Sequence, residues 1–162
     1  MTLPNEARSH SLIGAGIVLG AGLGGFLDGI WLHQILQWHN MLSGWVPPDT
    51  LVDAKVNMFW DGVFHMGVWL VTVLGLYMLW RAIRNGAPRR SGRTLIGAML
   101  AGWGLFNVIE GTIDHLLLDI HHVQEYARNH LPADLAFLAF GLLLIFIGWL
   151  LMRAGSQRAR LD

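Results

Sequence analysis

The chain contains no cysteine and few charged residues. Without cysteine it forms no disulfide, thiolate zinc site, iron–sulfur cluster or cysteine nucleophile. Charged residues make up 14% of its 162 residues, whereas soluble domains contain about 25%. The net charge is zero, so no overall positive field favours nucleic acid as a partner. Because 54% of the residues are hydrophobic, the composition indicates a membrane protein in contact with the lipid bilayer.

Four apolar runs are visible, at roughly residues 12–38, 57–80, 94–118 and 132–152. Each is long enough to cross the membrane, because about 20 helical residues span its ~30 Å of hydrocarbon. We therefore expect one all-α domain over residues 1–162, an integral membrane four-helix bundle. The N-terminus lacks a strongly basic segment and a small-residue cleavage site, so we expect the first run to be retained.

Basic residues predict the orientation of the chain. Nine of them lie before the first run, between the second and third runs, or after the fourth. The two other connections carry only Lys55 and Arg128. Because cytoplasmic segments are enriched in Lys and Arg, we expect both termini to be cytoplasmic.

Acids and histidines gather at the opposite, outer ends of three of these runs. Ionisable groups inside a bilayer are costly, and each is a functional-site hypothesis. The residues that we expect to ligate metal are Asp28, His33, His39, Asp61, His65, Glu110, Asp114, His115, His121 and His122. Those that we expect to be solvated loop or cap residues are Asp119, Glu125, His130 and Asp134.

The depth of each candidate follows from helix geometry. Sixteen residues separate positions 12 and 28, and also positions 94 and 110, which is about 24 Å of helix. This places Asp28, His65 and Glu110 in the deepest layer. His33 lies about 140° around a regular helix from Asp28, so we expect it to support another ligand or bind a second ion. The residues expected at or outside the surface are His39, His121 and His122.

Mixed carboxylates and imidazoles suit zinc, iron, manganese or copper. Ten candidates could hold one or two such ions. An iron or copper site would fit a metal-dependent oxidoreductase, and zinc with a carboxylate base would fit a hydrolase. A protein that binds or passes copper or zinc without turnover is the other class. Polar packing alone, bis-histidine haem with His65 opposite His33 or His115, and a proton or ion path remain alternatives.

The outer cluster follows a repeat in the sequence. Acid-glycine, then His five and eleven residues after the acid, occurs at Asp28 and again eighty-two positions later at Glu110. Helices one and two would then correspond to helices three and four as a parallel internal repeat. At this offset Asp61 aligns with Leu143, so one arm of a symmetric site is missing.

A ridge of small residues, Gly16, Gly20 and Gly24, lies on the first run. Such ridges let helix backbones approach closely. It either packs inside the chain or forms the seam of a homo-oligomer.

The motifs DGIWLHQILQWHN, WDGVFH and FNVIEGTIDHLLLDIHHV resemble those of a family of uncharacterised bacterial four-span membrane proteins, catalogued as a domain of unknown function. The resemblance covers nearly the whole chain and implies a bacterial inner-membrane protein. The Asp61 and His65 pair is also similar to the Asp-x3-His metal pair in the membrane subunit of particulate methane monooxygenase.

Overall fold

The computed structural model describes the backbone of residues 5–87 and 92–158 and the side chains of residues 11–87 and 92–155. Within these ranges the chain is entirely helical apart from its connections. Its four α-helices are α1 (Asn5–Asp28), α2 (Leu51–Arg84), α3 (Gly92–Glu110) and α4 (Leu131–Arg158). Two seven-residue π-helices, η1 (Gly29–Ile35) and η2 (Gly111–Leu117), continue α1 and α3. The prediction of an all-α protein with four membrane-length helices is confirmed.

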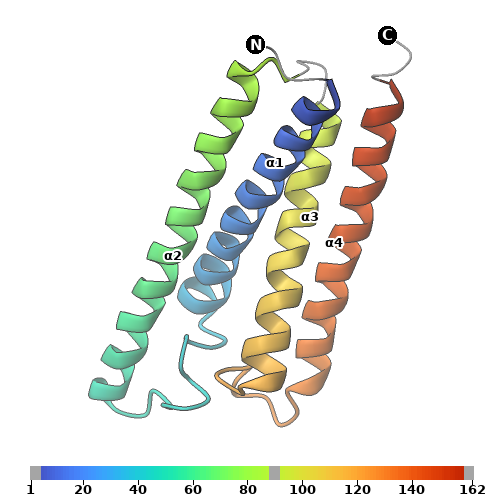
Figure 1. Cartoon of the computed structure of the whole chain (residues 1–162). Helices are drawn as coiled ribbons and strands as arrows, with labels where there is room; N and C mark the ends of the chain where they lie inside the picture. The colour runs from blue at the N-terminus through green and yellow to red at the C-terminus, as the bar shows by residue number, and fades with distance from the viewer. Residues whose placement is uncertain (1–4, 88–91, 159–162) are drawn as a thin grey trace.

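The helices stand side by side in the order α2, α1, α3, α4 (Figure 1). Helix α1 packs against α2 and α3, and α3 packs against α4, whereas the described residues of α2 and α4 make no contact. Half of the most apolar window of α1 is buried, against 11% in α2. The two edge helices therefore present most of their apolar surface outward, which only lipid can solvate favourably.

Small residues let α1 and α3 approach closely at the centre of the row. A Cβ atom at Gly20 would collide with the backbone of Met99, and one at Gly102 would collide with the backbone of Ile17. Gly16 likewise faces Ala98. The glycine ridge is thus occupied within the chain, and its assignment as the seam of a homo-oligomer is not supported.

The helix boundaries differ from those expected. Helix α2 begins at residue 51 instead of 57 because Thr50 caps it, with the hydroxyl accepting a 3.2 Å hydrogen bond from the backbone N–H of Asp53. Regular α-helix ends at residue 28 in the first run, which was expected to continue to 38.

The long connections, residues 36–50 and 118–130, lie together at one end of the row, opposite the start of α1 and the end of α4 (Figure 1). Three of the basic residues used for orientation, Arg89, Arg90 and Arg160, lie outside the described residues. The orientation of this end in the membrane stays a prediction.

Candidate metal centre

Each of the two acids that open the sequence repeat stands directly before a π-helix. In a π-helix the backbone bonds run from i to i+5, so residues five apart share a face. His33 Nε2 consequently lies 3.4 Å from an oxygen of Asp28, and His115 Nε2 lies 3.0 Å from an oxygen of Glu110. The expected separation of about 140° between Asp28 and His33 assumed a regular α-helix and is wrong.

Beyond each π-helix the chain turns back over the end of the helix row. The turns contain Gln37 and Asp119, whose φ angles of 51° and 53° are uncommon for residues other than glycine. His39 and His121, two residues after these turns, point inward and are each only 1% exposed. Both imidazoles therefore belong to the cluster, while their expected depth at or outside the membrane surface stays a prediction.

The rings of His39 and His121 are held by backbone carbonyls of the opposite connection. His39 donates from Nδ1 to the carbonyl of Val123 at 3.0 Å, and His121 donates from Nδ1 to the carbonyl of Met41 at 3.0 Å. A carbonyl can only accept, so Nδ1 carries the proton in both rings. In the neutral imidazole, Nε2 then presents a lone pair.

Two further acids lie beside the other two rings. Asp61 on α2 contacts Nδ1 of His33 at 2.8 Å, and Asp134 on α4 lies 3.6 Å from Nδ1 of His115. Asp134 was expected to be solvated, but it is 1% exposed and accepts a 2.9 Å hydrogen bond from the backbone N–H of Val123. It is a residue of the cluster that the sequence analysis did not identify.

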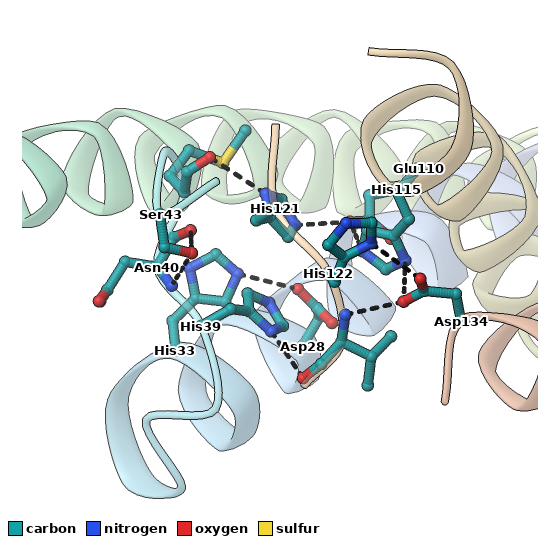
Figure 2. A network of polar contacts seen from close by, with 12 residues as sticks. Asp28, His33, His39, Asn40, Ser43, Glu110, His115, His121, His122 and Asp134 are labelled. Carbon is teal, nitrogen blue, oxygen red and sulfur yellow. Dashed lines mark hydrogen bonds and ion pairs between the residues drawn. The ribbon is translucent and has the colours of Figure 1, made fainter. Parts of the chain in front are cut away.

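The imidazoles of His33, His39, His115 and His121 lie close together in this cluster (Figure 2). Ligand atoms of His33, His39 and His121 all lie within 4.8 Å of one another. The same limit holds for Glu110, His115 and His121. Two three-ligand groups that share one imidazole could hold one ion or two.

Several polar atoms of the cluster are buried without a hydrogen-bond partner among the described residues. His121 Nε2 lies 3.2 Å from an oxygen of Glu110, a contact that needs a proton on Nε2 in addition to the one on Nδ1. His115 Nε2 lies close to the same carboxylate but outside hydrogen-bonding geometry, and His39 Nε2 has no partner among the described residues. A lone pair beside a carboxylate is repulsive unless a proton or a metal cation lies between them.

The electrostatic environment of His39 disfavours protonation of its ring. Burial lowers the pKa of this imidazole well below its ordinary value, and the neighbouring rings of His121 and His33 lower it further. The ring is therefore neutral near pH 7 and its Nε2 lone pair is free for coordination. Such neutral imidazoles, oriented by an acceptor at the other nitrogen, are typical of metal sites in proteins.

Other predicted ligands lie outside the central cluster. His65 donates from Nδ1 to the carbonyl of Asp61 on its own helix at 2.7 Å, and its ring packs beside Gly29. Asp114 is half-buried on η2 and belongs to neither three-ligand group. His122 contacts Asp134 through Nδ1 and belongs to neither three-ligand group. Asp61 contacts Nδ1 of His33 and belongs to neither three-ligand group.

Four helices of membrane-spanning length, with an enclosed cluster of histidines and carboxylates at one end, define this chain as a multi-pass membrane protein. Residues 15–155 match the family described as "Predicted membrane protein (DUF2243)". The chain belongs to this family, which confirms the resemblance found from its motifs. No curated protein and no solved structure matches the chain.

Proposed function

We propose that the protein holds a transition-metal centre at the loop end of its helices. The proposed ligands are Asp28, His33, His39, Glu110, His115 and His121. The observation that carries the proposal is the buried Nε2 lone pair of His39, which has no partner among the described residues and lies beside the imidazoles of His33 and His121. A metal ion accepts such lone pairs and also neutralises the two central carboxylates, which are otherwise costly to bury.

The enclosure of the centre favours redox chemistry over hydrolysis. None of the six ligands is more than 8% exposed. A hydrolase must admit an ester or amide together with water, whereas electrons, protons or a small molecule such as dioxygen need no wide opening. We therefore propose a metal-dependent oxidoreductase with iron or copper, whose ligand preferences fit imidazole and carboxylate donors.

A second candidate is a protein that binds and passes on metal without turnover. The contact of His122 with Asp134 favours it, because this pair continues the polar cluster outward from the centre. In either case, we propose that the centre lies toward the periplasmic side of a bacterial cytoplasmic membrane, which the distribution of basic residues supports.

Elemental analysis of protein purified in detergent without chelator tests the metal site. We expect bound iron or copper in the unaltered protein, and loss of most of it in His39→Ala and His121→Ala. His65→Ala is the matched control, since this imidazole lies outside the cluster. Metal content that is equal in all three variants would contradict the proposed ligands. Zinc alone would favour the non-redox candidate, and Soret absorbance would identify haem instead.

A further inference from the structure

A line of acid and imidazole contacts leads from the buried cluster to the surface. Asp134 lies 3.6 Å from His115 Nδ1 and 2.8 Å from His122 Nδ1. His122 Nε2 in turn lies 2.9 Å from an oxygen of Asp119. The side chains become steadily more accessible along this line, from 1% for Asp134 to 18% for His122 and 76% for Asp119. All of these side chains are of types that can ligate a metal, and each lies within 3.6 Å of the next.

The other half of the molecule has the same backbone arrangement without these ligands. At the positions eighty-two residues earlier, Gln37 replaces Asp119 and Asn40 replaces His122. Gln37 has the same positive φ as Asp119, and Asn40 donates to Asp61 at 3.0 Å as His122 contacts Asp134. Amide side chains are poor ligands for transition metals. Amide side chains hold the turn in the first half of the chain, so the acid and the imidazole of the second half are not needed to hold theirs.

Capture of a cation requires an accessible pair of ligands, and Asp119 with His122 provides one. The imidazole of His130 stacks beside that of His122, with ring centroids 4.3 Å apart. A carboxylate and one or two imidazoles form an incomplete coordination set, which binds an ion more weakly than a site with three or four protein ligands. A weak outer site and a strong inner site form a gradient along which an ion can move inward.

We infer that Asp119 and His122 form an outer metal-binding pair that captures a divalent transition-metal ion and transfers it to the buried centre. This inference rests on the proposed function, because it needs a metal centre to load. Transfer is by ligand exchange: the ion gains Asp134 and then His115 as it leaves Asp119. The pair thus affects how fast the centre is filled and leaves the amount of metal bound at equilibrium unchanged.

Loading kinetics test the inference. Metal-free full-length protein in detergent is mixed with Zn²⁺ held by a zinc-sensitive dye, and transfer from the dye is followed by absorbance until it is complete. The test variants are Asp119→Asn and His122→Asn. The second copies Asn40 and is expected to keep the hydrogen bond to Asp134. Gln37→Asn is the matched control, because it lies in the same type of turn with the same positive φ in the other half.

We expect both test variants to load at least about tenfold more slowly, a loss typical of removing groups around a metal site, with the same final zinc content. The control should load at the unaltered rate. Loading at the unaltered rate in both test variants would overturn the outer pair. A lower final content in His122→Asn would also overturn it, since His122 would then belong to the centre. Failure of the unaltered protein to bind zinc at all would overturn the inferred capture of divalent ions, whereas the elemental analysis tests the iron or copper centre separately.

Discussion

Replacing His39 by leucine tests whether this side chain ligates a metal or only packs in the interior. In metal-free protein the change removes a buried Nε2 that has no partner among the described residues, and it leaves the carbonyl of Val123 without its donor. Each unsatisfied buried group costs about 1–3 kcal/mol, so the two effects oppose each other. Because leucine also fills much of the volume of the imidazole, we expect the free energy of unfolding without metal to change by less than about 1.5 kcal/mol.

With metal present, the same variant should lose stability. A metal at one hundred times its dissociation constant adds about 2.7 kcal/mol to the free energy of unfolding, and a hundredfold loss of affinity reduces this gain to about 0.4 kcal/mol. For a chain of this size the metal-dependent rise in Tm would then fall from about 5–11 °C to about 1–2 °C. Thermal unfolding in detergent, with buffered metal or with chelator, measures both quantities.

His65→Leu is the control for this experiment. It removes a partly buried imidazole from outside the cluster, so the metal-dependent rise in Tm should be kept. The reasoning is refuted if His39→Leu keeps the full rise, or if the two variants lose it equally.

Three further predictions test the surroundings of the centre. Asp61→Asn removes the charge that orients His33 through Nδ1, so metal affinity measured by chelator competition should fall about 10- to 100-fold; unchanged affinity would contradict this positioning role. Gly20→Ala places a methyl group against the backbone of Met99 and should lower the free energy of unfolding by about 1–3 kcal/mol. Gly67→Ala, which meets open space, should change it by no more than about 0.5 kcal/mol, and equal effects of the two alanines would argue against close packing of α1 on α3. Chelation of the purified protein should lower Tm while the helix content, measured by circular dichroism, stays the same.

The four helices could be predicted because membrane insertion depends on the local length of an apolar run. The start of α2 was placed six residues late because its first turns, around Asp53 and Lys55, are polar, although the Thr50 cap marks the true start. Capping signals are short and are easily missed beside a strong hydropathy signal.

The positions of individual ligands were harder to predict, since the depth and face of each residue were calculated for a regular α-helix. The π-helices change both, and bring His33 beside Asp28. The turn at Gln37 then reverses the chain, so that His39 is buried among the other imidazoles, which counting residues along a helix does not reveal. No feature of the sequence that we used predicts a π-helix.

Asp134 was missed because the offset of the repeat changes after the first connection. Asp61 and Asp134 each accept a hydrogen bond from a backbone N–H of a connection, and they are seventy-three residues apart. The two acids that precede the π-helices are eighty-two residues apart. Gly75 and Gly148, which pack against α1 and α3 respectively, share the shorter offset. Comparing the glycines of the second and fourth runs could therefore have revealed Asp134 as the counterpart of Asp61.

The two connections orient each other's imidazoles: the carbonyl of Val123 fixes His39, and the carbonyl of Met41 fixes His121. Neither half of the chain can therefore set the direction of its own inner ring. A shortened protein with only α1, η1 and α2 would complete this arrangement only by associating with a second such chain, each supplying the carbonyl that the other lacks.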